Sequence, residues 1–149
     1  MERFKLIPSV YLILLKDGKV LLSRRFNTGY EDGNYGLVSG HAEEKETFRE
    51  ALSREVFEEV GIEIDSSDLN LVLTMHRQCG DHERVDFFFT ANAWNGEIKN
   101  AEPQKCDDLD WFPIDNLPDN TIPYVKKAIE SYFDGMNYCE FGWDGSCRK

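Results

Sequence analysis

The amino-acid sequence predicts a single α/β domain that spans residues 1–149. A chain of 149 residues is long enough to bury one sizeable hydrophobic core. Short apolar runs bounded by turn residues predict several strands, and two longer segments have the composition of helices. The predicted order is a strand pair, a central helix, several further strands and a late helix, which is typical of a mixed α/β protein.

The first two predicted strands flank the dipeptide Asp17-Gly18. An apolar run at 10–15 precedes it and a second run at 20–25 follows it. Asp-Gly between two apolar runs is a strong hairpin signal, so we expect an antiparallel pair. Residues 26–40 are rich in Gly, Asn and Tyr, which indicates a loop. Later strands are expected at 37–38, 71–75, 85–91 and around Trp111-Phe112.

The central helix is expected to begin at Thr47 and to end at Gly61. Thr47 and Glu50 form a Thr-x-x-Glu capping box, and Gly61 is a natural stop. Its core-facing stripe is predicted to be Phe48, Leu52, Val56 and Val60. The late helix is expected at 123–133, where Pro123 suits the first turn. The aromatic residues of the tail, 134–149, are expected to pack on the body, and a flap over the substrate is the alternative.

Three glutamates of the central helix lie close together. At about 100° per residue, Glu55, Glu58 and Glu59 fall within roughly 100° of arc. Glu55 and Glu59 lie at the edge of the apolar stripe, where an uncompensated carboxylate is costly. A hard divalent cation would neutralise such a cluster. The alternative is an ordinary solvated acidic helix face.

The stretch from Gly40 to Ile62 resembles the Nudix box. That pattern is Gly, five residues, Glu, seven residues, then Arg-Glu-apolar-x-Glu-Glu-x-Gly-apolar. Its fixed positions are filled here by Gly40, Glu46, Arg54, Glu55, Val56, Glu58, Glu59, Gly61 and Ile62. The resemblance implies an α/β/α sandwich with a mixed sheet and a metal-dependent pyrophosphohydrolase.

The resemblance also implies a set of metal ligands. Glu55, Glu58 and Glu59 would hold Mg²⁺ or Mn²⁺, and a backbone carbonyl just before the box glycine often joins them in this family. Ser39 would supply that carbonyl, within a Val38-Ser39-Gly40 sequence that stands where the family usually has Pro-Gly-Gly.

Further roles follow from the same resemblance. Glu102 is the candidate for an extra carboxylate, with an exposed loop acid as the alternative. Either Glu55 or Glu102 would take the proton of the attacking water. Arg54 and Glu46 would form a supporting ion pair that orients the ligands. Of two adjacent arginines at a strand end only one can face inward, and we favour Arg25 as the contact to substrate phosphate.

The implied substrate is a nucleoside diphosphate derivative. Short single-domain members most resemble (d)NTP pyrophosphohydrolases, which release a nucleoside monophosphate and pyrophosphate, and an oxidised nucleotide is one candidate substrate. ADP-ribose or a nucleotide sugar is the enzymatic alternative. A non-catalytic nucleotide-binding regulatory module is the alternative of another class, although such modules would be expected to lose box carboxylates.

The composition of the chain limits the classes of binding partner and the cellular compartment that are expected. A net charge of −11 argues against nonspecific binding to nucleic acid or to an anionic membrane, so a small-molecule substrate is expected. Four cysteines without metal-ligand spacing, and no targeting segment, favour a cytoplasmic protein with reduced thiols. The chain is expected to act as a monomer or a homodimer.

Overall fold

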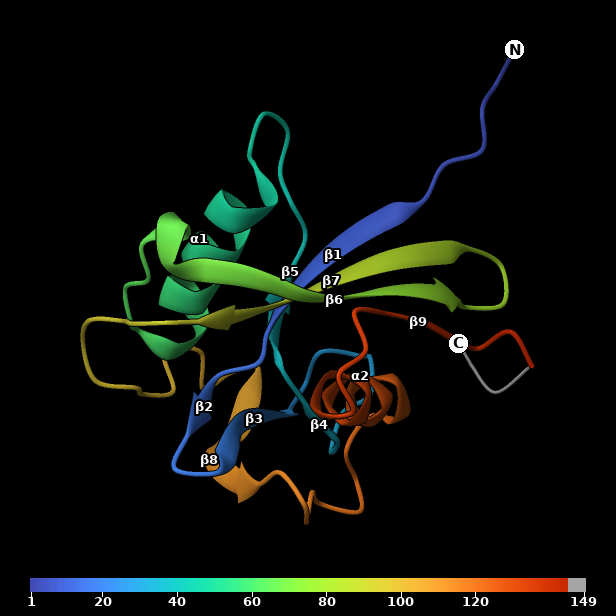
Figure 1. Cartoon of the computed structure of the whole chain (residues 1–149). Coiled ribbons are helices and arrows are strands. Elements are labelled where there is room, and N and C mark those ends of the chain that lie inside the picture. Colours follow the sequence, from blue (N-terminus) through green and yellow to red (C-terminus); the bar gives the residue numbers. More distant parts are fainter. Residues whose placement is uncertain (145–149) are drawn as a thin grey trace.

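A five-stranded mixed sheet forms the centre of the molecule (Figure 1). The computed structural model describes residues 1–144. The strand order is β5-β1-β7-β6-β9, in which the β1–β7 and β6–β9 pairs are parallel and the others antiparallel. The strands are β1 (Ile7–Leu12), β5 (Val38–Gly40), β6 (Leu69–Gln78), β7 (Glu83–Ala91) and β9 (Tyr138–Phe141).

A second, smaller sheet is built around β3. This strand pairs antiparallel with its three neighbours. The strands are β2 (Leu15–Lys16), β3 (Lys19–Arg25), β4 (Tyr35–Gly36) and β8 (Cys106–Pro113). The predicted Asp17-Gly18 turn joins β2 to β3, and both of its residues have positive φ, 52° and 75°, as the tightest hairpin turns require.

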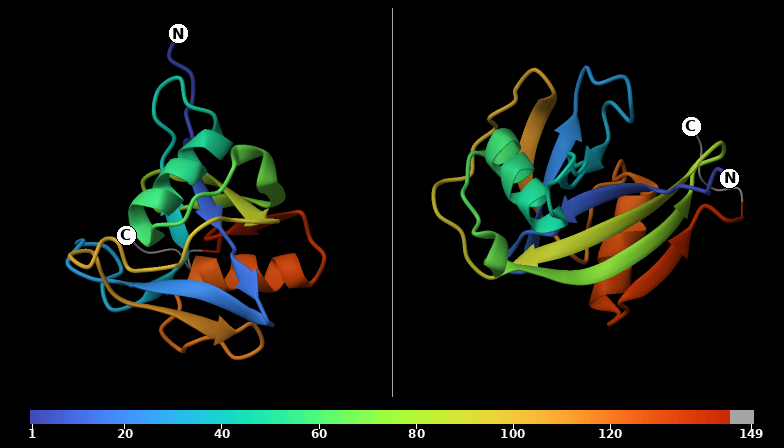
Figure 2. Two further views of the ribbon diagram at one scale, coloured as in Figure 1. Left: turned by 90° about the vertical axis from the view of Figure 1, so that its left-hand side faces the viewer. Right: turned by 90° about the horizontal axis from the view of Figure 1, so that it is seen from above.

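The two α-helices, α1 (Phe48–Val60) and α2 (Pro123–Phe133), cover opposite faces of the central sheet (Figure 2). A short 3₁₀ helix, η1 (Ser66–Asp68), precedes β6. Successive side chains of a strand point to opposite faces. Along β1, Val10 and Leu12 therefore pack in the core beside α1, and Tyr11 packs in the core beside α2. This arrangement confirms the predicted α/β/α sandwich with a mixed sheet.

The ends of α1 lie where the sequence places them. Thr47 is the N-cap of a complete capping box with Glu50, and Gly61 ends the helix in the left-handed conformation with φ 75°. Leu52, Val56 and Val60 are buried, and Phe48 is half-buried and stacks on Phe87. The late helix has its predicted bounds, with Pro123 in its first turn.

The apolar run at 10–15 does not form one strand of a simple hairpin. β1 ends at Leu12 in the central sheet, and β2 begins at Leu15 in the other sheet. Ile13 and Leu14 are both fully buried, on the α2 side and the α1 side respectively, where the chain crosses between the sheets. A segment buried on both sides has the same apolar composition as a continuous strand, so its sequence does not reveal the break.

Two further segments contain strands that the sequence did not indicate. Residues 26–40 were expected as a loop with one short strand, but they contain both β4 and β5. The tail adds β9 to the edge of the central sheet, and Trp143 donates a hydrogen bond from Nε1 to the His76 carbonyl at 3.1 Å. The tail residues up to 144 therefore pack on the body, whereas Gly145 and Cys147 lie outside the described residues. Within residues 1–144, no helix has both the length and the apolar character needed to cross a bilayer.

Candidate active site

Two neighbouring cavities open on the surface between the sheets. Their volumes are about 420 and 410 Å³, and Arg25 and Ser39 line both of them. We call the first one the aromatic cavity because Tyr11, Tyr30 and Tyr124 contribute to its wall. We call the other one the acidic cavity, since Glu43, Glu55, Glu58, Glu59 and Glu102 line it.

The most buried acid of the acidic cavity is Glu59. Its atom Oε2 is buried and has no hydrogen-bond partner within residues 1–144. Burial raises the pKa of Glu59 well above the usual value, and the charges of Glu55 and Glu102 raise it further. The backbone N–H of Ser39 hydrogen-bonds the carboxyl and opposes this shift. A carboxylate in this position is stable only with a partner for its unused oxygen.

Glu55 lies against the box glycine. A Cβ placed on Gly40 would come within 2.3 Å of both Cγ and Cδ of Glu55, which no real side chain tolerates. Glycine is therefore needed here for close approach, since Gly40 is not among the residues with positive φ. Burial raises the pKa of Glu55, while hydrogen bonding to Arg54 works in the opposite direction.

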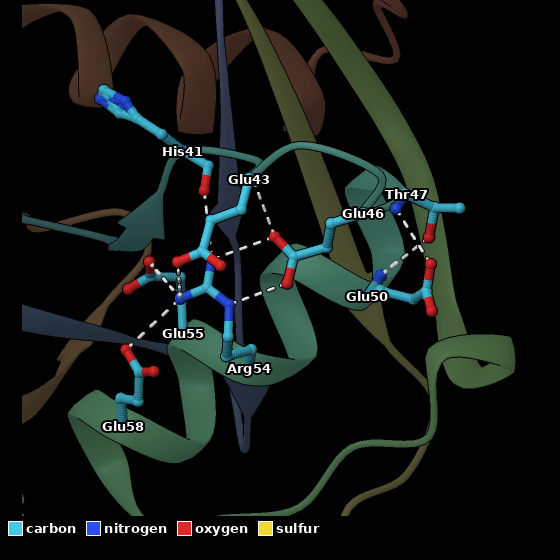
Figure 3. A network of polar contacts seen from close by, with 8 residues as sticks. All are labelled: His41, Glu43, Glu46, Thr47, Glu50, Arg54, Glu55 and Glu58. Carbon is cyan, nitrogen blue, oxygen red and sulfur yellow. Dashed lines mark hydrogen bonds and ion pairs between the residues drawn. The ribbon is translucent and has the colours of Figure 1, made fainter.

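One guanidinium group connects the acids of the loop and the helix (Figure 3). Arg54 donates two hydrogen bonds to Glu46, from Nε at 2.8 Å and from Nη2 at 3.1 Å. Its Nη1 contacts Glu55 at 2.9 Å and Glu58 at 3.5 Å. Its Nη2 also donates to the His41 carbonyl at 3.2 Å. Arg54 thus fixes the loop after β5 to the acidic face of α1, and it lowers the pKa of Glu46.

The donor set of the acidic cavity suits a divalent metal ion. Within the described part of the chain, no three acidic, His or Cys side chains already surround one point, because Glu55 and Glu58 turn toward Arg54. Hard cations such as Mg²⁺ prefer carboxylate and carbonyl oxygens. The unpartnered Oε2 of Glu59, in a cavity with four more carboxylates, is the atom that such an ion would satisfy.

Arg25 lies at the junction of the two cavities and is held in place there. Its Nε donates to the Tyr30 carbonyl at 2.6 Å, and its guanidinium lies 5.3 Å from the centre of the Tyr30 ring. The loop that carries Tyr30 is closed by Asp32, which accepts hydrogen bonds from the backbone N–H groups of Thr28 and Gly29. Tyr30 is 42% exposed, so an aromatic face remains open to a ligand.

A buried polar network forms the floor of the aromatic cavity. Arg77 donates from Nε to Asp86 at 2.6 Å, and both side chains are almost completely buried. The Tyr11 hydroxyl donates to Asp86 at 3.1 Å and contacts the Tyr124 hydroxyl at 3.2 Å. The Arg77 guanidinium stacks 3.7 Å from the centre of the Tyr124 ring. The network connects β1, β6, β7 and α2 beneath the cavity.

The structure gathers the residues singled out in the sequence into one region. Arg25, Ser39, Arg54, Glu55, Glu58, Glu59 and Glu102 all line the acidic cavity, and Glu46 is bonded to Arg54 at its margin. Sequence reasoning missed the wall of the aromatic cavity, notably Tyr30, Arg77, Arg84 and Tyr124. One available signal was Asp86, a charged residue inside the apolar run at 85–91.

The fold is an α/β/α sandwich, and the acidic cavity gathers carboxylates whose oxygens are of the type that divalent cations prefer. Residues 5–132 match the NUDIX domain, and the chain belongs to that family. The predicted family is therefore confirmed. Members of this family generally use divalent metal ions and act on small nucleotide-derived substrates.

Named relatives extend the comparison. The ADP-ribose pyrophosphatase of Methanocaldococcus jannaschii is 31% identical over 138 residues, which cover 91% of this chain and 79% of the relative. The NAD-capped RNA hydrolase NudC of Stutzerimonas stutzeri is 30% identical over 128 residues, covering 86% of this chain. The match spans only 43% of that relative's length.

A solved structure agrees with the fold. The MutT NUDIX hydrolase from Burkholderia pseudomallei superposes with a TM-score of 0.76 and 26% identity. The match covers 85% of this chain and 97% of that chain. All three proteins carry names of hydrolases or pyrophosphatases, which is the predicted enzyme class.

Proposed function

We propose that this chain hydrolyses the diphosphate linkage of a nucleoside diphosphate derivative, in a reaction that depends on a divalent metal ion. The observation that carries the proposal is the pair of cavities joined at Arg25 and Ser39. A diphosphate at this junction would lie beside the carboxylates of α1, with its nucleoside against the aromatic side chains. Nucleobases stack favourably on such rings.

Glu55, Glu58 and Glu59, with the Ser39 carbonyl, are the proposed ligands for Mg²⁺ or Mn²⁺. The N–H and C=O of one strand residue point to the same side of the strand. Because the Ser39 N–H bonds the Glu59 carboxyl, the Ser39 carbonyl would point to the same side of β5 as Glu59. A bound divalent ion would supply charge neutralisation on the phosphates and a lowered pKa of a coordinated water.

The chain's own groups would handle the proton and the phosphates. Glu55 and Glu102 both line the acidic cavity, and one of them would accept the proton of the attacking water. Arg25, already oriented by Tyr30, would donate hydrogen bonds to phosphate oxygens. Arg54 and Glu46 would position Glu55 and Glu58 through their shared hydrogen bonds.

The relatives favour ADP-ribose or a related dinucleotide over the (d)NTP that the sequence placed first. One relative is named ADP-ribose pyrophosphatase, and several are named NAD-capped RNA hydrolases. A net charge of −11 would repel the body of an RNA, so we propose a small ADP-ribose-type molecule as the substrate. A (d)NTP is the second candidate, because short single-domain members of the family most resemble (d)NTP pyrophosphohydrolases.

A substrate panel tests the proposal. ADP-ribose, NADH, a nucleotide sugar and canonical and 8-oxo (d)NTPs would be incubated with Mg²⁺ or Mn²⁺, and with EDTA as the control. We expect metal-dependent release of AMP from ADP-ribose or NADH, identified by chromatography. Glu58→Gln should lower kcat by orders of magnitude, while exposed Glu63→Gln, outside both cavities, should not.

The outcomes separate the alternatives. Release of pyrophosphate from one triphosphate alone would replace the ADP-ribose class by the (d)NTP class and leave the mechanism unchanged. Tight nucleotide binding without turnover of any substrate would instead support a regulatory module. Turnover that persists in EDTA would contradict the metal site.

A further inference from the structure

The two cavities carry opposite charge, although the chain as a whole is acidic. In the acidic cavity five glutamates outnumber Arg25, Arg54 and Lys105, whereas in the aromatic cavity Arg25, Arg77 and Arg84 outnumber a single acid, Asp81. In a chain of net charge −11, three guanidinium groups around one cavity indicate a ligand with negative charge there. Arg77 is already neutralised by Asp86, so the question concerns the other two arginines.

The position of Arg84 lowers the stability of the central sheet. It lies directly opposite Arg77 in the β6–β7 ladder, and like charges in this position destabilise a strand pair. Asp86 hydrogen-bonds Arg77 and not Arg84. Within residues 1–144, Arg84 forms no ion pair, and its hydrogen bonds go to His82 and Ser9.

The hydrogen bonds of Arg84 orient its guanidinium and leave part of it free. Nε donates to Nε2 of His82 at 3.2 Å, and Nη1 donates to the Ser9 hydroxyl at 3.1 Å. The His82 ring is fixed in turn by a 2.7 Å contact between Nδ1 and Asp81. A guanidinium has five N–H donors, so three remain for a ligand of the cavity. An oriented arginine with free donors is the usual partner of a phosphate.

Arg84 lies away from the junction of the two cavities, where the diphosphate is proposed to bind. Arg25 and Ser39 line both cavities, but Arg84 and Ser9 line only the aromatic one. Tyr11 pairs with Ser39. Ser9 lies two residues before Tyr11 on β1, so about 7 Å separates Ser9 from Tyr11 at the usual rise of a strand. An anion at Arg84 would therefore belong to the part of the substrate that enters the aromatic cavity.

We propose that Arg84, with Ser9, binds a second phosphate on the nucleoside part of the substrate, separate from the diphosphate that is cleaved. The inference rests on the proposed function, because it treats the aromatic cavity as the nucleoside site. If Arg84 binds this phosphate, the preferred substrate is a nucleoside diphosphate derivative that carries an additional phosphate on its nucleoside, and not ADP-ribose itself.

Binding of non-hydrolysable fragments tests this site without turnover. Calorimetry without metal would compare AMP with adenosine 2′,5′-bisphosphate and adenosine 3′,5′-bisphosphate. We expect at least one bisphosphate to bind about tenfold more tightly than AMP, a difference of about 1.4 kcal/mol. The advantage should shrink in high salt, because partly exposed ionic contacts are screened. Equal affinities for all three would overturn the proposal.

Substitution ties the effect to the residue. Arg84→Gln should reduce the affinity ratio of bisphosphate to AMP to about one, whereas Arg49→Gln, which removes an exposed arginine of α1 outside both cavities, should preserve it. A preserved ratio in folded Arg84→Gln, judged by its urea midpoint, would remove Arg84 from the site.

Turnover separates the two proposals. NADPH and NADH differ by one phosphate, and we expect a higher kcat/KM for NADPH or for another phosphorylated analogue. Hydrolysis of ADP-ribose combined with equal binding of AMP and both bisphosphates would retain the proposed function and reject the second phosphate site. Selective binding of a bisphosphate without hydrolysis of any diphosphate would reject the proposed function and retain an anion site at Arg84.

Discussion

At the scale of single residues, the acidic cavity is built from groups that are unfavourable alone. The Oε2 atom of Glu59 is buried and lacks a hydrogen-bond partner within residues 1–144, and two other carboxylates lie close to this group. A group that destabilises the fold and faces a cavity is a candidate for function, because stability alone would not select it.

Glu59→Gln is expected to weaken metal binding without weakening the metal-free fold. The amide keeps the shape of the side chain but removes the negative charge and one ligand oxygen. We expect the Kd for Mn²⁺ to rise by about tenfold or more, because even the loss of a residue that only supports a metal ligand lowers metal affinity by that much. Calorimetric titration and urea unfolding in EDTA would measure both effects, with exposed Glu63→Gln as the control. Unchanged Mn²⁺ affinity would exclude Glu59 as a ligand.

Gly40→Ala tests the close approach of the loop to the helix. The new Cβ would come within 2.3 Å of both Cγ and Cδ of Glu55, so the whole Glu55 side chain would have to change rotamer and its carboxylate would leave its position. We expect kcat to fall by about tenfold or more, comparable to the misplacement of a catalytic group. The urea midpoint should change little, since a flexible side chain absorbs the contact. Wild-type kcat in this variant would show that the position of Glu55 is not important.

At the scale of elements, α1 is the platform for the acidic cavity, and its start is set by a local motif. Thr47 accepts a hydrogen bond from the Glu50 N–H at 3.1 Å, and Glu50 accepts one from the Thr47 N–H at 3.0 Å. Arg54 then connects the following turn to Glu46. The cap and the ion pair together hold the register between the loop after β5 and the helix.

Thr47→Ala should lower the free energy of unfolding by about 1 kcal/mol, the usual cost of a lost N-cap. Thr47→Ser keeps the hydroxyl group and should recover most of that loss. Urea unfolding of the three proteins would measure the difference. A destabilisation by serine equal to that by alanine would mean that the methyl group of Thr47, and not its hydrogen bond, stabilises this end of the helix.

At the scale of the whole molecule, one buried network joins the central sheet to α2. Asp86 accepts hydrogen bonds from Arg77 on β6 and Tyr11 on β1, and Tyr11 contacts Tyr124 on α2. Burial raises the pKa of Tyr11 and of Tyr124, so both hydroxyls remain protonated and able to donate. The same network forms the floor of the aromatic cavity, so fold stability and the shape of the site depend on the same contacts.

Asp86→Asn should destabilise the protein by about 3–5 kcal/mol, because it leaves the buried Arg77 without a counter-charge. Asp110→Asn on β8 is the matched control, because Asp110 is exposed, and it should change stability by less than about 0.5 kcal/mol. Urea unfolding would measure both. Equal stability of the two variants would mean that the Arg77–Asp86 pair adds nothing over a neutral hydrogen bond.

The sequence by itself determined the helices and the acidic cluster. The ends of α1 and the spacing of Glu55, Glu58 and Glu59 depend on residues a few positions apart, so local rules apply. The hairpin at Asp17-Gly18 could also be predicted from the sequence, because its turn requires positive φ and Asp-Gly is a preferred dipeptide for that conformation. The metal-ligating role given to these glutamates remains a prediction.

Only the tertiary structure determined the break between β1 and β2, the place of β9 and the composition of the aromatic cavity. The chain crosses between sheets at Ile13 and Leu14, and β9 pairs with β6 some 60 residues away in the sequence, as with Thr74 and Tyr138. The aromatic cavity combines Ser9, Arg25, Arg84 and Tyr124 from four different elements or their flanks. No periodicity links such residues, because their proximity arises from sheet register and from the packing of α2. The arginines that line the aromatic cavity, on which the proposed second phosphate rests, are brought together only by the folded chain.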